Sequence, residues 1–243
     1  MKNHSDETYG KQMAAKYDAW YGDLDDDMLE VLESLASGGR ALELGIGTGR
    51  VALPLQQRGI EVHGIDASEA MIAQLHAKPG GDQIPVTLGN FADVAVDGQF
   101  SMIYVVLSTF FVLLTQEEQV RCFENVAHHL DPGGFFVIEA YVPDLRRFDQ
   151  GQAVRAIHAD VGEVRLEASL LDPTTQQITG QKVVLTGQGI QLYPHKVRFA
   201  WPSELDLMAR IAGLQLFQRW ENWKRTPFSG GSSRHISVYH LKE

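Results

Sequence analysis

Three glycines at alternate positions follow a short apolar segment, and this pattern carries the clearest chemical meaning in the chain. Residues 41–49 read Ala-Leu-Glu-Leu-Gly-Ile-Gly-Thr-Gly. Glycine permits a sharp turn after a strand and leaves bare backbone against which a ligand can press. Arg50 then opens an amphipathic helix whose free N–H groups point toward the loop, an arrangement that can hold an anion. The pattern therefore predicts a ligand-binding loop.

An acidic residue, Asp66, ends the next apolar strand, at residues 60–65. It follows Gly49 at close to the roughly 20-residue offset at which an acid meets ribose hydroxyls in nucleotide-binding α/β folds. A surface acid at a strand end is the alternative interpretation, but the glycine loop at this spacing favours the ribose role. Ser68 then caps a new helix that carries Met71 on its apolar face.

The dinucleotide fingerprint G-x-G-x-x-G does not fit, because Arg50 stands where its third glycine would be. A catalytic Tyr-x-x-x-Lys or similar pair is also absent, which argues against a nicotinamide-dependent oxidoreductase. With Glu43 before the first glycine, the form is E-x-G-x-G-x-G. That form resembles motif I of the class I S-adenosylmethionine methyltransferases.

Three further segments carry the same resemblance. Residues 64–71 look like the second motif of the family. Gly89-Asn90-Phe91 stands where the family usually has Gly-Asp near the adenine amino group. Asn90 departs from that pattern, yet its side-chain carbonyl can still accept a hydrogen bond from an amine, and a plain turn asparagine is the alternative. Residues 130–139 resemble the helix, turn and fifth strand, so the resemblance spans roughly residues 9–142.

The resemblance implies S-adenosylmethionine as the cofactor, S-adenosylhomocysteine as its product, and no metal. A non-catalytic protein that only binds S-adenosylmethionine is a second, less favoured hypothesis. The residues implied in cofactor contact are Tyr17, Glu43, Gly45, Gly47, Gly49, Arg50, Asp66, Ala67, Met71, Asn90, Phe91 and Leu107.

The alternation of helices and strands predicts an α/β fold, with a Rossmann-like, seven-stranded, mostly parallel sheet. Its strands are expected at about 40–44, 60–65, 84–89, 100–106, 134–140, 214–223 and 235–241. Residues 164–170 alternate in polarity instead, which is typical of a half-exposed antiparallel strand. We therefore expect a methyltransferase core of residues 1–150 with 201–243, an N-terminal helical lid at 1–22, and a small antiparallel substrate-side sheet inserted after strand five at 151–200.

Ligands in open α/β sheets sit at the carboxyl ends of the strands, and this rule selects further site residues. Substrate contacts are predicted at Phe110, Phe111, Tyr193 and Trp201, and catalytic or orienting roles at Tyr21, Glu139 and Tyr141. His195 is interpreted as a surface or core histidine rather than a base.

The inserted sheet and the Tyr17–Tyr21 segment make the chain similar to small-molecule methyltransferases of natural-product pathways, including amino-sugar N,N-dimethyltransferases. Those enzymes tend to carry a histidine after the fourth strand, where this chain has Val112. That departure favours an aromatic acceptor of the indole or phenol type, methylated on carbon, nitrogen or oxygen. An amino-sugar acceptor remains the alternative.

Composition limits the partners and the location. A formal net charge of -10 argues against a nucleic-acid substrate, which requires a basic stripe. The longest apolar run, residues 102–114, is too short to span a bilayer, and the N-terminus lacks the apolar stretch of a signal peptide. We expect a cytoplasmic monomer or homodimer that acts on a small molecule away from membranes.

Overall fold

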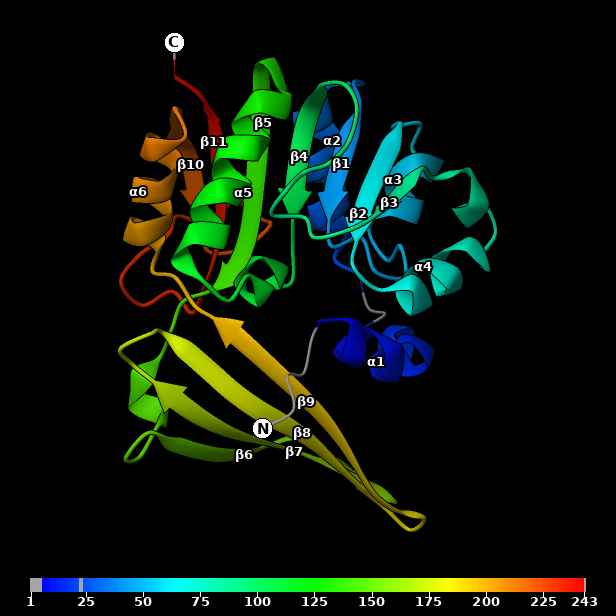
Figure 1. Cartoon of the computed structure of the whole chain (residues 1–243), viewed down its shortest axis with the longest axis vertical. Helices are drawn as coiled ribbons and strands as arrows, with labels where there is room; N and C mark the ends of the chain where they lie inside the picture. The colour runs from blue at the N-terminus through cyan, green and yellow to red at the C-terminus, as the bar shows by residue number, and fades with distance from the viewer. Residues whose placement is uncertain (1–5, 22–23, 243) are drawn as a thin grey trace.

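Two β-sheets and one bridging helix organise the chain. The computed structural model describes residues 6–21 and 24–242, and within the first helix it describes the side chains of residues 13, 14 and 16–21. The larger sheet has helices on both faces, and the smaller sheet lies beyond one edge of this core with α1 between the two (Figure 1).

The elements follow the expected alternation of helices and strands until the inserted block. The larger sheet and its helices comprise α2 (Asp26–Ala36), β1 (Ala41–Leu44), α3 (Ala52–Gln57), β2 (Val62–Asp66), α4 (Glu69–His76), β3 (Val86–Leu88), β4 (Phe100–Val105), α5 (Gln116–His129), β5 (Leu130–Tyr141), α6 (Pro202–Ile211), β10 (Leu214–Trp220) and β11 (Arg234–Leu241). The remaining elements are α1 (Asp6–Tyr21), β6 (Gln152–Asp160), β7 (Glu163–Asp172), β8 (Gln177–Thr186), β9 (Gly189–Arg198) and three short 3-10 turns, at Gly81–Gln83, Thr109–Val112 and Leu145–Arg147.

The larger sheet has seven strands in the order β10-β11-β5-β4-β1-β2-β3. Strands β1 to β5 pair in parallel, while β11 runs antiparallel to both β5 and β10. The order reverses between β1 and β4, so the carboxyl ends of these two strands diverge into a crevice. This is the place where open α/β sheets bind ligands, and the predicted fold class is confirmed.

The sheet separates two hydrophobic cores. One side contains Phe123, Phe136 and Tyr239 in contact with α5 and α6, and the other contains Leu32 and Tyr104 beneath α2 and α3. Successive residues of the central strands alternate between the two cores, so these strands are apolar on both faces. That burial fixes the strand register and holds the loops at the carboxyl ends in place.

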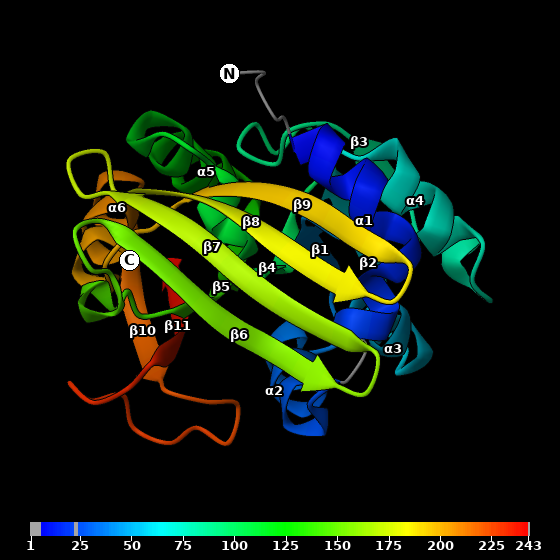
Figure 2. The same ribbon diagram turned by 90° about the horizontal axis from the view of Figure 1, so that it is seen from below.

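The inserted block forms a four-stranded antiparallel sheet in the order β6-β7-β8-β9. One face of this sheet is turned toward α1 and the strand ends of the core (Figure 2). Its opposite face exposes Val154, Leu170, Ile190 and Leu192. We propose that residues 151–200 are the substrate-side subdomain, as the sequence predicts.

Helix α1 contacts both the core and the inserted sheet. Asp18 accepts a hydrogen bond from the Thr48 hydroxyl at 2.6 Å and pairs with Lys78 at 2.6 Å. On the other side, the Trp20 ring meets the Tyr193 ring edge-on at 5.3 Å. Part of the predicted lid, residues 1–5 and 22, lies outside the described residues.

The observed boundaries differ from the expected ones at a few ends. Helix α6 begins at Pro202, and its N-cap is Trp201. Proline is preorganised for the first helical position, so it sets the start of this helix. Strand β10 ends at Trp220, three residues earlier than expected.

Candidate active site

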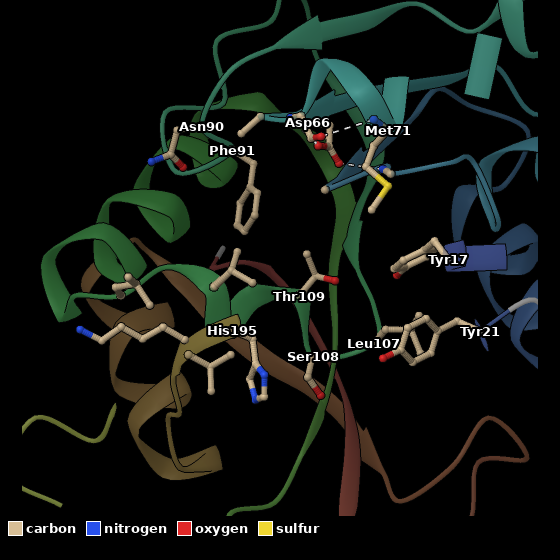
Figure 3. A pocket seen from close by; sticks show the side chains of 18 of the residues that line it. Tyr17, Tyr21, Asp66, Met71, Asn90, Phe91, Leu107, Ser108, Thr109 and His195 are labelled. Carbon is tan, nitrogen blue, oxygen red and sulfur yellow. Dashed lines mark hydrogen bonds between the residues drawn. The ribbon is translucent and has the colours of Figure 1, made fainter. Parts of the chain in front are cut away.

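A cavity of about 360 Å³ lies at the carboxyl ends of the parallel strands, between the core, α1 and the inserted sheet. Figure 3 shows its labelled side chains converging from these three parts of the chain. Its lining on the side of β1 to β3 comprises Gly45, Gly47, Asp66, Ala67, Ser68, Met71, Asn90 and Phe91. The rest of the lining comprises Tyr17, Tyr21, Leu107, Ser108, Thr109, Val112, Leu114, Tyr141, Lys182, Pro194, His195, Lys196 and Val197.

The glycine loop curves around one end of this cavity. Gly45 and Gly47 have φ angles of 74° and 56°, a region that side chains with a Cβ rarely adopt. A Cβ on Gly45 would lie 2.5 Å from Thr109 Cγ2, so the loop and the Thr109 turn fit together only because residue 45 has no side chain. A Cβ on Gly47 would meet no other atom closer than 4.0 Å, because it would project into open space.

Asp66 stands at the end of β2 and organises the loop beside it. Its Oδ2 accepts a hydrogen bond from the Gly47 N–H at 2.8 Å, and its Oδ1 accepts one from the Ser68 N–H at 2.8 Å. Burial raises the pKa of this carboxyl above its usual value. Each carboxylate oxygen retains a second lone pair, which a diol could occupy.

Apolar side chains form the adjoining wall. Met71 and Phe91 are buried residues that line the cavity, Met71 beside Asp66 and Phe91 beside Asn90 (Figure 3). The Asn90 Oδ1 accepts a hydrogen bond from the Ala92 N–H at 2.9 Å, so this asparagine also shapes its own turn. An open glycine loop, a carboxylate and an apolar slot together fit the sulfonium-bearing chain, the ribose and the adenine of S-adenosylmethionine.

The backbone after β4 is strained where it borders the cavity. Leu107 and Ser108 have φ angles of 55° and 61°, although neither is glycine. Such residues persist only where surrounding contacts hold them. Glu139 supplies those contacts: its Oε2 accepts from the Leu107 N–H at 3.0 Å, and its backbone oxygen accepts from the Ser108 N–H at 3.0 Å.

The sequence predicts a catalytic or orienting role for Glu139, whereas the structure places its side chain behind the cavity wall. Its side chain is 2% exposed and does not line the cavity. Oε1 accepts hydrogen bonds from Trp223 Nε1 and from Arg234 Nη1, each at 3.2 Å. With these donors and Leu107, both carboxylate oxygens accept hydrogen bonds behind the wall, where the side chain holds the β4 turn.

Three tyrosines line the cavity: Tyr17 and Tyr21 from α1, and Tyr141 from the end of β5. The sequence predicts Tyr17 as a cofactor contact and the other two as catalytic or orienting groups. The rings of Tyr17 and Tyr21 lie 5.0 Å apart on α1, and the Tyr21 hydroxyl hydrogen-bonds to the Lys182 ammonium. Burial raises the pKa of Tyr17 to about 12 and that of Tyr141 to about 12. Both hydroxyls are therefore protonated at neutral pH and can donate hydrogen bonds.

The four residues predicted to contact an aromatic acceptor do not line this cavity. Phe110 and Phe111 have no exposed surface, because the 3-10 turn after β4 directs both into the core under α5. Tyr193 is buried against Trp20, and Trp201 borders a separate shallow depression near α6. These rings stabilise the fold rather than line the cavity.

Three residues of the predicted cofactor set also lie off the cavity surface. Glu43 is buried and accepts a hydrogen bond from the Tyr104 hydroxyl at 3.0 Å, and burial raises the pKa of its carboxyl to about 8. A Cβ on Gly49 would lie 2.2 Å from Leu75 Cδ1, so this glycine is required by helix packing. Arg50 is half-buried and is not among the lining residues.

The sequence predicts that the inserted sheet lies on the substrate side, but it does not identify which residues of the sheet line the cavity. Lys182 and His195 line the cavity from β8 and β9. They stand on the same face because Tyr193 and Lys182 are register partners and His195 is two residues beyond Tyr193. The period-2 pattern of β9 contained this signal, but only the pairing partners show which face is turned inward.

Residues 41–134 match a family described as a methyltransferase domain. Over 99% of this chain and 100% of the other, the structure is similar to the CcbJ methyltransferase from Streptomyces caelestis, with 38% sequence identity and a TM-score of 0.91. The chain belongs to the S-adenosylmethionine-dependent methyltransferases. It is thus a methyltransferase of the type found in natural-product pathways, and the resemblance seen in the sequence is confirmed.

Two curated relatives add detail. One, 29% identical over 83% of this chain and 82% of its own length, is the cypemycin N-terminal methyltransferase of a Streptomyces species. The other, 29% identical over 62% of this chain and 60% of its own length, is the dTDP-4-amino-2,3,4,6-tetradeoxy-D-glucose N,N-dimethyltransferase of Saccharopolyspora spinosa. The first name specifies methylation at an N-terminus, and the second specifies N,N-dimethylation.

Two features are absent from the described residues. They contain no group of three or more His, Cys, Asp or Glu side chains placed to hold a metal ion. In the same part of the chain, no helix is long and apolar enough to cross a membrane.

Proposed function

We propose that this protein transfers the methyl group of S-adenosylmethionine to an amine nitrogen of a small natural-product intermediate. The observation that carries the proposal is the division of one cavity into two unlike halves. The half beside β1 and β2 fits the cofactor, and the half beneath the inserted sheet presents polar and cationic groups to an acceptor.

The cofactor half assigns roles to particular residues. The Gly45–Gly47 backbone would hold the amino-acid end of S-adenosylmethionine, and Asp66 would accept hydrogen bonds from its ribose diol. Met71 and Phe91 would contact the adenine, with Asn90 at its polar edge. When bound, this cofactor supplies an electrophilic methyl group on a positively charged sulfur.

The acceptor half favours an amine over a phenol or an indole. The side chains that would have stacked on a flat acceptor, those of Phe110, Phe111 and Trp201, lie elsewhere. Instead, Tyr21, Tyr141, Lys182 and His195 offer hydrogen-bonding groups around the apolar floor of Val112 and Leu114. An acceptor with several polar groups can be paired in such a site, which avoids roughly 1–3 kcal/mol for each polar group that would otherwise be buried unpaired.

The chain also has the means to enclose the reaction. Helix α1 covers the cavity with Tyr17 and Tyr21 and is tied to the core through Asp18. Exclusion of water and alignment of the two reactants are worth roughly 7–11 kcal/mol in well-oriented reactions. Two relatives, one an N-terminal methyltransferase and the other an N,N-dimethyltransferase, support transfer to nitrogen.

A panel of acceptors tests the proposal. The enzyme is incubated with methyl-deuterated S-adenosylmethionine and, separately, proline amide, an alanyl dipeptide, glucosamine, tyrosol or indole. Mass spectrometry then locates the transferred group. We expect labelled N-methyl product from at least one of the three amines. Labelling of tyrosol or indole alone would contradict the proposal and restore the aromatic acceptor. An Asp66→Ala variant serves as the control for enzyme-dependent transfer.

A further inference from the structure

A row of charged side chains crosses the inner face of the inserted sheet. The Arg155 guanidinium on β6 lies 2.6 Å from Glu167 Oε2 on β7. The other oxygen of that carboxylate, Oε1, lies 3.3 Å from His195 Nε2 on β9. Hydrogen bonding to His195 and the nearby Arg155 charge lower the pKa of Glu167 to about 2. Glu167 is therefore an ionised carboxylate at neutral pH.

Contact between β7 and β9 is unusual, because β8 runs between them, and Gly180 makes it possible. Gly180 pairs with Ser169 on β7 and with His195 on β9. A Cβ at this position would lie 2.5 Å from both Cε1 and Nε2 of the imidazole. The backbone of Gly180 is not in the left-handed region, so glycine serves here to leave space for the ring. The sheet thus provides a recess in which the imidazole reaches Glu167.

The carboxylate determines which ring nitrogen carries the proton. A neutral histidine that donates from Nε2 to Glu167 leaves Nδ1 as a bare acceptor. His195 Nδ1 is buried and has no hydrogen-bond partner among the described residues, while the residue itself lines the cavity. Figure 3 places the ring beside Ser108 and Thr109, on the side of the cavity opposite Asp66.

We propose that His195, oriented by Glu167, is the group that accepts the proton of the acceptor amine before methylation. The inference rests on the proposed function, since amines of this kind are mostly protonated at neutral pH. One N–H bond of the ammonium breaks, its electron pair remains on nitrogen, and the proton forms an N–H bond at Nδ1. The lone pair released in this way is what attack on the methyl carbon requires. The imidazolium then passes its proton to solvent after the product leaves.

The surroundings of His195 suit a reversible proton acceptor. Within the described residues that line the cavity, the charged or titratable groups are Asp66 on β2, Lys182 on β8, Lys196 on β9, Tyr141 on β5, and Tyr17 and Tyr21 on α1. The Lys182 ammonium disfavours a second positive charge in the cavity, whereas the Glu167 carboxylate directly stabilises a positive charge on the His195 ring. The imidazolium would thus be held by its ion pair with Glu167 until its proton passes to solvent.

The pH profile of turnover distinguishes this role from a structural one. With the best amine of the panel, we expect His195→Gln to lower kcat about a hundredfold or more at pH 7. The loss should shrink steadily toward pH 10, because free amine then reaches the site without a base. Glu167→Gln should lose less and show the same slope. Equal losses at every pH would overturn the proposal.

Matched variants separate the imidazole from the sheet that carries it. His158→Gln alters an exposed histidine on β6 that does not line the cavity, and it should leave the profile unchanged. Gly180→Ala retains His195 but fills its recess, so it should reproduce the pH-dependent loss. S-adenosylmethionine affinity should stay within about twofold in all four variants, because the cofactor half is untouched.

A second measurement needs no acceptor. Two-bond proton–nitrogen NMR of the enzyme with S-adenosylhomocysteine reports which nitrogen of His195 is protonated. We expect the Nε2–H tautomer, converting toward the other form in Glu167→Gln. An Nδ1–H tautomer in the unaltered enzyme would overturn the proposal. If no panel amine is methylated, the proposed function fails, while this spectrum still decides whether Glu167 orients His195.

Discussion

The two halves of the cavity are built in different ways. The residues of the cofactor half lie at the ends of β1, β2 and β3 or in the loop or helix that follows each strand, and most lie within residues 45–71. The acceptor half combines α1, the turn after β4, the end of β5 and two strands of the inserted sheet. The first half is local in sequence, whereas the second depends on how distant strands are paired.

This difference leads us to expect unequal responses to mutation. Changes in the cofactor half should alter S-adenosylmethionine affinity and leave acceptor selection intact. Changes in the acceptor half should do the opposite. The following experiments test that separation, beginning with the largest expected effect on cofactor affinity.

The strongest test replaces Gly47 with valine. The new side chain would project into the cavity, and the φ angle of 56° is strained for any β-branched residue. We expect S-adenosylmethionine affinity, measured by calorimetry, to fall roughly a hundredfold. Gly38→Val is the matched control, since Gly38 has a φ of 77°, open space around it and no place in the cavity. Equal losses in both variants would show that strain alone explains the effect.

Asp66→Ala should have the next largest effect. It removes the acceptor for the ribose and also the bonds that hold Gly47 and Ser68. Hydrogen bonds to a charged group are worth roughly 1.5–3 kcal/mol, so affinity should fall about tenfold or more. Calorimetry that shows unchanged affinity would remove Asp66 from the cofactor site. Asp82→Ala, at an exposed position after α4, provides the control.

The sequence predicts the roles of Gly47 and Asp66 because these roles depend on residues that are close to them in the chain. A strand, a glycine turn and a capped helix are readable from local pattern, and so are most strand boundaries. The sequence predicts Phe110 and Phe111 as cavity residues, whereas both are buried in the core. Local pattern does not determine their direction. Whether a residue after a strand faces the cavity or the core depends on the turn conformation, here on the strained Leu107 and Ser108 backbone.

The inserted sheet illustrates the same limit. An alternating strand has two faces, and its sequence does not state which one is turned toward the ligand. Tyr193 and His195 share a face, yet Trp20 of α1 covers the first while Gly180 leaves a recess for the second. The alternation along β9 would place Trp201 on the same face, but the strand ends at Arg198, so the alternation does not extend to Trp201.

Substitutions in helix α1 can remove its contacts with the core and its contacts with the inserted sheet separately. Asp18→Ala removes the contacts of α1 with Thr48 and Lys78 in the core. Trp20→Ala removes the edge-on contact with Tyr193 and the cation–π contact with Arg165 in the sheet. Each contact is partly exposed, so we expect turnover to fall only about twofold to fivefold.

Hydrogen exchange in residues 13–21 should become faster in both variants, with little change in β4 or β5. Glu30→Ala, on the exposed face of α2, should change neither quantity. If α1 exchanges at the same rate in all three variants, the helix does not depend on these anchors.

Glu43→Gln should have the smallest effect on affinity and a distinct effect on stability. Burial raises the pKa of Glu43 to about 8 from an ordinary value of 4.5. Between these values the folded state binds a proton that the unfolded state has lost, so stability should fall as pH rises toward 8. The glutamine variant cannot lose this proton. Its Tm should therefore decline less between pH 5 and pH 8.5 than that of the unaltered protein, as measured by calorimetry.

The anchoring of α1 also sets an order of events during synthesis. Lys16 on this helix donates a hydrogen bond to Gln191 on β9, a residue 175 positions later in the chain. At roughly 5–20 residues per second, that strand leaves the ribosome about 9–35 seconds after the helix. The glycine loop and β2 can form their part of the cavity in the meantime. Closure of the cavity by α1 and β9 must therefore follow the synthesis of the glycine loop and β2, so a nascent chain can meet its cofactor while the site is still open.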